Sequence, residues 1–314
     1  MTGNNPTRSA RDERLSLIDH LARWINWPRF VFAVTLAFFL TSILFPFYWM
    51  ASSSFKTYAE IGSREPVYIP SALRLDAYRQ LFDPNVPVSR RTSSFENFGL
   101  NILNSIKVAV PTSIIAVILS TLGAYAVARL RFRGKELLLN SVLLIYLFPG
   151  TLLIIPLFAM LSRIGARLGF DVRDNLPVLI FTYLAQTLPV ALYMLANYFR
   201  TIPAEIEQAG LIDGCSRLGV IWRITLPLAI PALVSVGIYT FMIAWNEFLY
   251  ALVFLYDDDL FTMPIKINAI FNNPTPRPHV VMAASTIMTL PVVILFLALE
   301  RFLEEGLTAG GVKG

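Results

Sequence analysis

The polar stretch that decides the fold reads Pro203-Ala-Glu-Ile-Glu-Gln-Ala-Gly-Leu-Ile-Asp-Gly-Cys-Ser-Arg217 and is followed by Leu226-Pro227-Leu-Ala-Ile-Pro231. Pro203 suits the first turn of a helix, because its missing N–H would have no partner there. Gly214 can adopt the positive φ that commonly ends a helix. The stretch therefore predicts a short helix, a glycine turn, a second short helix capped by Asp213 or Ser216, and an interruption at the two prolines.

This stretch lies between two of six long windows that contain no Asp, Glu, Lys or Arg. A helix of about 20 residues crosses the hydrocarbon core of a bilayer, and every window is long enough. A soluble fold could bury one such helix, but it has no way to bury six. The sequence therefore predicts an all-α polytopic membrane protein whose spans are about 30–51, 108–128, 137–162, 175–199, 224–246 and 280–299.

The composition agrees with membrane embedding. Hydrophobic residues make up 55% of the chain and charged residues 15%, whereas soluble proteins carry about 25% charged residues. The single cysteine, Cys215, excludes an internal disulfide and a cysteine-based metal cluster. The net charge of +5 is modest, and in a membrane protein it reflects basic inner loops rather than nucleic-acid binding.

The basic residues indicate the orientation. The segment 1–29 contains five arginines and precedes an apolar window that is too long for a signal peptide, so we expect an uncleaved anchor with its N-terminus inside. Short basic loops dominate the positive-inside rule, and residues 129–136 carry Arg129, Arg131, Arg133 and Lys135. Six spans then place both termini and the loop 203–223 in the cytoplasm, and the long segment 52–101 outside, as a cap or a docking surface.

The loop 203–223 has the character of a surface rather than of a span. Glu205 and Glu207 fall in the first helical turn, where the helix dipole favours negative charge. Ile206, Ala209 and Ile212 recur on one face, and the second helix has an apolar side of its own. The loop could lie on the inner leaflet or receive another protein. Its acidic residues favour the second interpretation, because leaflet-binding helices are rich in Lys and Arg.

The loop resembles the coupling loop of ATP-binding-cassette (ABC) importer permeases. That family's pattern is Glu-Ala-Ala, two residues, Asp-Gly-Ala, and about ten residues later Leu-Pro and a further Pro. This chain departs from it at Gln208, Gly210 and Cys215, which puts a salt bridge through position 208 in doubt. Other motifs resemble the carbohydrate-uptake branch that includes the second maltose-type permease subunit: Ser54-Phe55-Lys56-Thr57, Asn104-Ser105, Trp245-Asn246-Glu247-Phe248 and the tail Gly306-Leu-Thr-Ala-Gly-Gly-Val-Lys-Gly314.

The resemblance implies a type I ABC importer permease fold in the prokaryotic plasma membrane, with a permease domain at 30–303 and a cytoplasmic tail at 304–314. Two permease subunits, usually different, would pair, and each would dock on an ATPase subunit that binds ATP and Mg. An extracytoplasmic solute-binding protein would deliver a di- or oligosaccharide or related sugar. The tail would reach the ATPase interface or fray. The residues implied for ATPase coupling are Glu207, Gln208, Ala209, Gly210, Asp213, Gly214, Cys215, Leu226 and Pro227.

Polar side chains within the spans suggest a substrate pathway. Glu247 is ionisable and close to membrane depth, which makes it a functional candidate, and amide and hydroxyl groups suit a sugar. The alternatives are that Glu247 is interfacial and that the remaining polar groups hold helices together. The candidate pathway residues are Gln186, Tyr193, Asn197, Asn246 and Glu247.

The chain is not expected to be an enzyme or to hold a cofactor of its own. It lacks the Gly-x-x-x-x-Gly-Lys-Ser/Thr phosphate loop, and His20 and His279 are too few and too far apart for a metal site or a catalytic triad. Two other functions stay open. One is a secondary transporter that uses Glu247 as a proton relay, which leaves the loop 203–223 unexplained. The other is an ABC importer permease for a non-sugar solute.

Overall fold

The computed structural model describes residues 27–82, 97–147, 149–272 and 277–311, and within these ranges the regular elements are all helical. Five helices are long and apolar enough to cross a membrane, or six if one bent pair counts as a single span. The all-α polytopic fold predicted from the sequence is confirmed. The N-terminal arginines up to Arg23 and the prolines Pro84 and Pro87 of the predicted outer segment lie outside the described residues.

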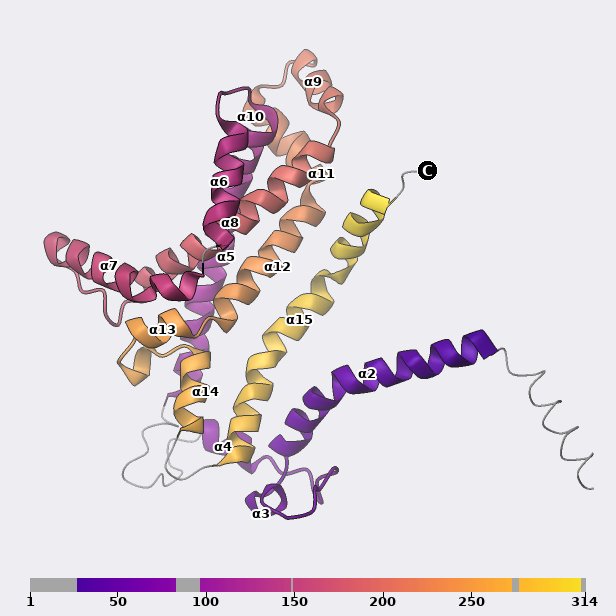
Figure 1. Cartoon of the computed structure of the whole chain (residues 1–314), viewed down its shortest axis with the longest axis vertical. Helices are drawn as coiled ribbons and strands as arrows, with labels where there is room; N and C mark the ends of the chain where they lie inside the picture. The colour runs from indigo at the N-terminus through magenta and orange to yellow at the C-terminus, as the bar shows by residue number, and fades with distance from the viewer. Residues whose placement is uncertain (1–26, 83–96, 148, 273–276, 312–314) are drawn as a thin grey trace, which may run out of the picture.

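The bundle is built around α5 (Phe98–Arg129), which packs along α8 (Leu176–Thr201) and α12 (Ile230–Asn246). The fourth long helix, α15 (Pro278–Gly311), runs beside α12 (Figure 1). One apolar cluster, which includes Ala124, Leu195, Phe199 and Val236, joins α5, α8 and α12 at one end of the bundle. A second cluster around Tyr183, Trp245 and Phe254 joins the same helices farther along.

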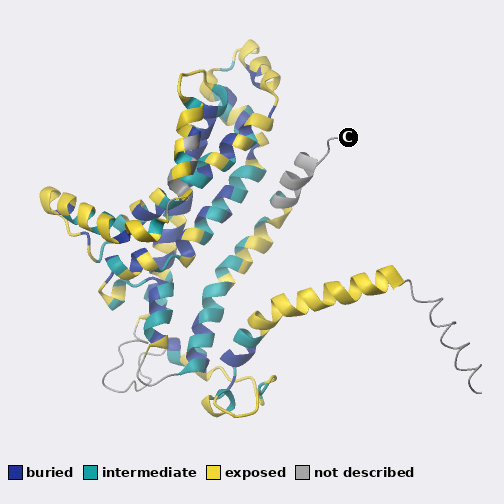
Figure 2. Cartoon of the chain, in the orientation of Figure 1, coloured by how far each residue is buried: buried dark blue, intermediate teal, exposed yellow. Residues whose placement is uncertain are grey.

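The first span, α2 (Trp27–Ser54), stands apart from this bundle. Figure 1 shows it running away from the other helices, and its most apolar stretch is 0% buried. Only its C-terminal end is packed, where Ser52, Ser53 and Ser54 are buried (Figure 2). An apolar helix with so few protein contacts requires lipid or another subunit around it.

The predicted spans differ from the helices in two places. The window 137–162 is not one helix: it divides into α6 (Lys135–Leu147), the 3₁₀ turn η2 (Gly150–Leu153) and α7 (Ile154–Leu168), and α7 leaves the bundle crosswise to α8 (Figure 1). The break falls at Pro149-Gly150, where proline lacks the N–H that a continuing helix needs. The second span begins at Phe98, ten residues before its uncharged window, because Lys107 is accommodated within α5.

The fifth span is bent. The chain passes from α10 (Arg217–Val220) through the π-helical turn η3 (Ile221–Thr225) and α11 (Leu226–Leu228) into α12. The helices on either side of Ala229 meet at 77°. Pro227 and Pro231 flank this bend in the first turns of α11 and α12, as the sequence predicts.

The end of the bundle opposite α9 (Ala204–Ile212) carries short helices: α3 (Tyr58–Ile61), α4 (Asp76–Phe82), α13 (Leu249–Phe254), η4 (Asp258–Leu260) and α14 (Met263–Phe271). Within the segment 52–101, α4 packs partly against the bundle, because Ala77 and Leu81 are buried in a third cluster with Phe98, Met263 and Ala284. The backbone of the predicted tail continues α15 as far as Gly311.

Candidate coupling loop and membrane cavity

The loop 203–223 has the helix–turn–helix form that the sequence predicts. Pro203 precedes α9, and Gly214 follows it with φ of +86°. The Ser216 Oγ accepts a hydrogen bond of 3.1 Å from the Gly219 N–H and so caps α10. Of the two predicted caps, Ser216 is therefore the one that acts at this helix.

Five large apolar side chains of the loop are exposed: Ile206, Leu211, Ile212, Leu218 and Trp222. The exposed fractions of Ile212 and Trp222 reach 86% and 70%. Figure 2 shows this end of the chain as mainly exposed. We call these five residues the apolar face of the loop. Gln208, Ala209 and Asp213 are exposed beside it, whereas Cys215 and Leu226 are half-buried and Pro227 is exposed.

Glu207 does not belong to that surface, and its part in ATPase coupling stays a prediction. It is only 7% exposed. Its Oε1 atom lies 2.9 Å from Arg129 Nε and accepts a hydrogen bond of 3.1 Å from Thr225 Oγ1, while the Tyr125 hydroxyl donates to Oε2 at 3.3 Å. Glu207 turns inward because the last turn of α5 supplies a cation at that point.

Gly210 also points inward, three residues after Glu207 on the same side of α9. It is buried, and a Cβ at this position would overlap the Cδ1 atom of Ile224 and approach Val220. The glycine that replaces the family's alanine therefore permits close packing between α9 and η3. Neither Glu207 nor Gly210 is available for direct contact with a partner in this conformation.

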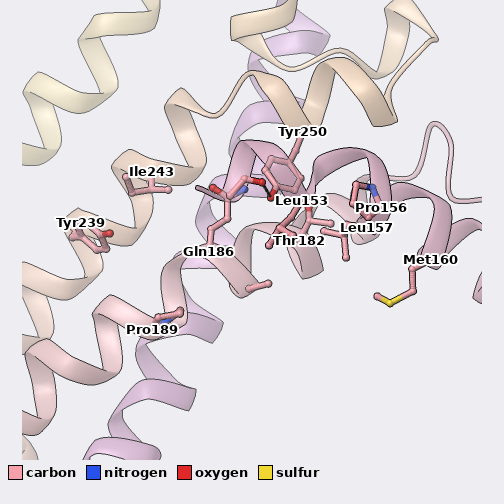
Figure 3. Close-up of a pocket in the computed structure, with 12 residues that line it drawn as sticks. Leu153, Pro156, Leu157, Met160, Thr182, Gln186, Pro189, Tyr239, Ile243 and Tyr250 are labelled. Carbon is pink, nitrogen blue, oxygen red and sulfur yellow. Dashed lines mark hydrogen bonds between the residues drawn. The ribbon is translucent and has the colours of Figure 1, made fainter. Parts of the chain in front are cut away.

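A cavity of about 490 Å³ lies between η2, α7, α8, α12 and α13 (Figure 3). Its walls are mainly apolar, and the polar side chains in them are those of Thr182, Gln186, Tyr239 and Tyr250. The Nε2 atom of Gln186 is buried, and none of the described residues accepts a hydrogen bond from it. The sequence-predicted Gln186 thus reaches a cavity of ligand size, whose lining residues are Gly150, Leu153, Pro156, Leu157, Met160, Thr182, Ala185, Gln186, Pro189, Tyr239, Ile243 and Tyr250.

The other four candidate pathway residues do not line this cavity. Tyr193 and Asn197 are exposed on α8. Asn246 donates to the Met242 carbonyl of its own helix at 2.9 Å. Glu247 accepts hydrogen bonds from the N–H groups of Tyr250 and Ala251, at 2.9 and 3.1 Å, and so caps the start of α13. For these four residues, a role in the pathway stays a prediction.

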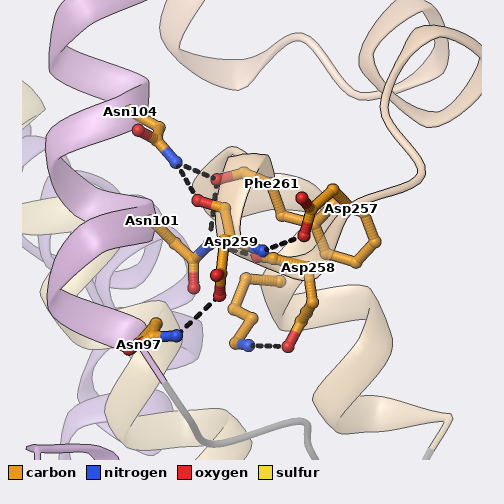
Figure 4. Close-up of polar contacts among 8 residues, drawn as sticks. Asn97, Asn101, Asn104, Asp257, Asp258, Asp259 and Phe261 are labelled. Carbon is orange, nitrogen blue, oxygen red and sulfur yellow. Dashed lines mark hydrogen bonds and ion pairs between the residues drawn. The ribbon is translucent and has the colours of Figure 1, made fainter. Parts of the chain in front are cut away.

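Sequence reasoning missed a polar anchor at the end of the bundle opposite α9 (Figure 4). Asn101 donates to the carbonyls of Asp258 and Phe261, at 2.9 and 3.0 Å, and Asn104 donates to the carbonyl of Asp259 at 2.7 Å. Ser105 Oγ accepts from the Met263 N–H at 2.7 Å. The motif Asn104-Ser105 therefore holds the segment before α14 onto α5. The recurrence of asparagine at 97, 101 and 104 on one helical face was the available signal.

Among the residues that the structure describes, no group of three or more His, Cys, Asp or Glu side chains is placed to hold a metal ion.

A bundle of apolar helices, a hairpin loop with an exposed apolar face at one end and a cavity between the spans define a polytopic membrane transport protein. The chain belongs to the family of binding-protein-dependent transport system inner membrane components, which matches residues 116–309. It is therefore an ABC transporter permease, a multi-pass subunit of the plasma membrane.

Curated relatives cover nearly the whole chain. The inner membrane ABC transporter permease protein YcjP of Escherichia coli K12 is 43% identical over 286 residues, which is 91% of this chain and 97% of that protein. The trehalose/maltose transport system permease protein MalG of Thermococcus litoralis is 36% identical over 86% of this chain and 92% of its own length. The trehalose transport system permease protein SugB of Mycobacterium tuberculosis is 34% identical over 86% of this chain and 93% of its own length.

Two solved structures share the fold. A chain of a bacterial ABC transporter that imports the acidic polysaccharide alginate aligns with a TM-score of 0.70 and 22% identity, over 87% of this chain and 95% of that one. A chain of the bacterial alginate transporter in complex with an alginate pentasaccharide-bound periplasmic protein aligns with a TM-score of 0.61 and 15% identity, over 88% and 93%. With the family match, the ABC importer permease fold expected from the sequence is confirmed.

Proposed function

We propose that this permease takes part in carbohydrate uptake and that an ATPase subunit grips its loop 203–223. The observation that carries the proposal is the apolar face of that loop. Five large apolar side chains are exposed on a short hairpin, although burying apolar surface is worth about 25 cal/mol per Å². Exposed apolar surface of this kind is typical of an interaction surface, and the acidic groups of the loop disfavour an anionic lipid surface.

The proposed substrate class is a di- or oligosaccharide. Relatives of the chain are named for trehalose and maltose transport. The cavity beside Gln186 supports this choice, because its amide, the hydroxyl of Tyr250 and the aromatic rings nearby are the kinds of group that bind sugars. Tyr193, Asn197, Asn246 and Glu247 would act elsewhere on the pathway, if the substrate passes them during the transport cycle.

The proposed assembly has three partners. An ATPase would bind ATP and Mg at the α9 end, so that this chain is a non-catalytic subunit without a cofactor. A second permease, different from this one, would cover the free side of α2. A solute-binding protein would dock at the end that carries α3 and α4. In this arrangement the α9 end and both termini are cytoplasmic, and the tail 304–314 extends α15 toward the ATPase.

The test of the ATPase contact uses one exposed residue at each end of the bundle. Ile212→Arg places a charge on the apolar face, where the side chain is 86% exposed. Leu73→Arg is the matched control, because Leu73 is 80% exposed at the opposite end. Each variant is co-expressed with the ATPase, second permease and binding protein encoded beside it, and the complex is purified in detergent. We expect Ile212→Arg to lose the ATPase and Leu73→Arg to retain it.

The substrate class is tested with the wild-type complex in proteoliposomes. Uptake of radiolabelled trehalose, maltose and larger oligosaccharides is compared with uptake of amino acids and phosphate, with and without ATP inside. ATP-dependent uptake of a sugar supports the proposal. Uptake of amino acids or phosphate alone would move the assignment to a non-sugar importer. Uptake by this chain without ATP would favour the secondary transporter, although both carboxylate oxygens of Glu247 already accept hydrogen bonds from α13.

A further inference from the structure

Four separate segments of the chain meet at one buried carboxylate. The carboxylate of Glu207 in α9 pairs with Arg129 and accepts a hydrogen bond from Tyr125, both in the last turns of α5. It also accepts a hydrogen bond from Thr225 at the end of η3. The same Arg129 donates from its NH2 group to the carbonyl of Ile202, at 2.7 Å, where α8 ends. The loop 203–223 is therefore tied to α5, α8 and the bent fifth span through one ion pair.

This junction is largely shielded from water. The side chains of Arg129 and Glu207 are 13% and 10% exposed, and Thr225 is fully buried. A buried ion pair contributes little net stability, because the cost of removing both charges from water offsets their attraction. Stability alone therefore does not account for it. What a hydrogen-bonded pair of this kind supplies is a defined geometry between the elements that it joins.

Thr225 connects the junction to the bend of the fifth span. Thr225 closes a π-helical turn, a rare element that is frequently found at functional sites, and the 77° bend follows within four residues. Besides the junction, α9 is held by its two ends, at Pro203 and at Gly214 with its positive φ, and by the apolar contact of Gly210 with Ile224. Without the directed hydrogen bonds of the junction, this apolar contact would let α9 pivot about its ends.

We propose that Glu207 and Arg129, together with Thr225, form a clamp that makes α9 move as one body with α5 and with the bend into α12. A displacement of the loop by the ATPase would then reach the spans instead of being absorbed by a pivot of α9. The clamp residues are positioning residues, which act through the loop and touch neither ATP nor the substrate. The inference rests on the proposed function.

The test measures sugar transported per ATP hydrolysed by the complete transporter in proteoliposomes. The probe is the radiolabelled disaccharide that the wild type takes up in the assay above. The variants are Glu207→Gln, Thr225→Val and the apolar pair Glu207→Leu with Arg129→Met, which removes both charges together. Glu205→Gln is the control, because Glu205 is an exposed carboxylate on the same helix. Arg129→Lys retains the charge and serves as the conservative variant.

We expect the clamp variants to assemble with the ATPase and to hydrolyse ATP, while the ratio of sugar to ATP falls by about tenfold or more, as a lost coupling interaction does. Glu205→Gln should keep the wild-type ratio, and Arg129→Lys should keep most of it. If the variants that remove the charges of Glu207 or Arg129 do not fold, Thr225→Val provides the test of the clamp, because it removes one hydroxyl and leaves the ion pair in place.

A wild-type ratio in folded Glu207→Gln and Thr225→Val complexes would overturn the clamp and leave the pair a structural feature. A parallel loss of ATP hydrolysis and transport at a constant ratio would overturn it as well. Failure of the wild-type chain to assemble with an ATPase, or to transport at all, would instead overturn the proposed function. The wild-type measurement therefore separates the two failures.

Discussion

Gly210 of α9 lies directly against Ile224 of the π-helical turn, and a Cβ on Gly210 would overlap the Cδ1 atom of Ile224 unless that side chain shifted. The two residues are fourteen positions apart and belong to the two arms of the hairpin. Their contact sets how closely α9 approaches η3, and it places Glu207 within reach of Thr225.

Replacing Gly210 with alanine should therefore destabilise the protein even though alanine favours helix. Inserting a methyl group into a packed site costs about 1–3 kcal/mol, and the helix-propensity gain returns about 0.5–1 kcal/mol. Ile224→Val removes the Cδ1 atom that the new methyl group would meet. We expect the double variant to recover most of the loss, so that the two substitutions are coupled by about 1 kcal/mol.

The measurement for this pair is the free energy of unfolding in detergent, from denaturant titration. Gly99→Ala in α5 is the control, because nothing lies within 4 Å of its added Cβ, and it should be neutral or slightly stabilising. Additive effects of Gly210→Ala and Ile224→Val would contradict the proposed contact.

Gly214 should be required for its backbone conformation and not for space. Its φ is +86°, and a Cβ there would meet nothing within 4 Å. Gly214→Ala is therefore expected to cost about 1–2 kcal/mol, the penalty of the left-handed region for an L-residue. Gly214→Asn should cost less, since asparagine tolerates that region. The unfolding titration checks both, and an equal cost for the two variants would point to a packing role instead.

Asn101 should contribute more to stability than an exposed asparagine with the same number of contacts. It is 0% exposed, and its amide donates to two carbonyls, those of Asp258 and Phe261. Asn101→Ala leaves these acceptors with fewer partners and should cost about 1–3 kcal/mol. Asn272 also donates two amide hydrogen bonds, but it is exposed, so Asn272→Ala should change stability by less than about 0.5 kcal/mol.

Hydrogen exchange localises the effect of Asn101→Ala. The amides of residues 258–263 should exchange faster in the variant, whereas those of α9 should be unchanged. Faster exchange throughout the bundle would mean that Asn101 stabilises the whole fold and does not specifically anchor this segment.

Glu60 should keep the segment between α2 and α4 folded well into the acidic range. Hydrogen bonds from Ser71 and Thr57 lower the pKa of Glu60 from 4.5 to about 2. Because the pKa is lower in the folded protein, the stabilisation is complete above pH 4.5 and is lost as the pH falls through about 2. Protection of the Thr57 and Ser71 amides, corrected for intrinsic exchange, should be equal at pH 7 and pH 5 and should decline below pH 4.5.

Glu60→Gln provides the comparison for that titration. Both carboxylate oxygens accept backbone N–H groups, from Thr57 at 2.7 Å and from Ser71 at 3.0 Å, and a glutamine would replace one acceptor with a donor. The variant should show weak protection at every pH. A wild-type decline between pH 7 and pH 5 would contradict the lowered pKa.

Features set by neighbouring residues could be predicted from the sequence. Pro203, Gly214 and Ser216 each act within a few positions, and the helix, turn and cap they predict are present. The uncharged windows indicated where the spans lie, because a helix pairs all its backbone N–H and C=O groups internally and a long apolar helix is therefore stable in lipid. The sequence Pro149-Gly150 also indicated a helix break locally, but the window 137–162 was predicted as one span because it contains no charged residue.

Features that depend on distant residues could not be predicted. Arg129 lies 78 positions before Glu207, and as a sequence feature it was one of several basic residues that indicated an inner loop. Nothing in the sequence 203–214 distinguishes Glu207, which turns inward, from Glu205, which stays exposed. In the same way, Gln186 lines the cavity while Tyr193 does not, because the bend of α12 and the path of η2 decide where the cavity lies.

The 77° angle at Ala229 determines how a force on the loop acts on the fifth span. A push along α10 and η3 meets α12 almost at right angles, so it acts as a torque about the bend and not as a thrust along the helix. As a lever arm, α12 is about 25 Å long, and a rotation of about 10° would move its far end by about 4 Å. Tyr239 and Ile243 lie on α12 in the wall of the cavity. A small tilt at the loop would therefore produce a larger displacement of the cavity wall.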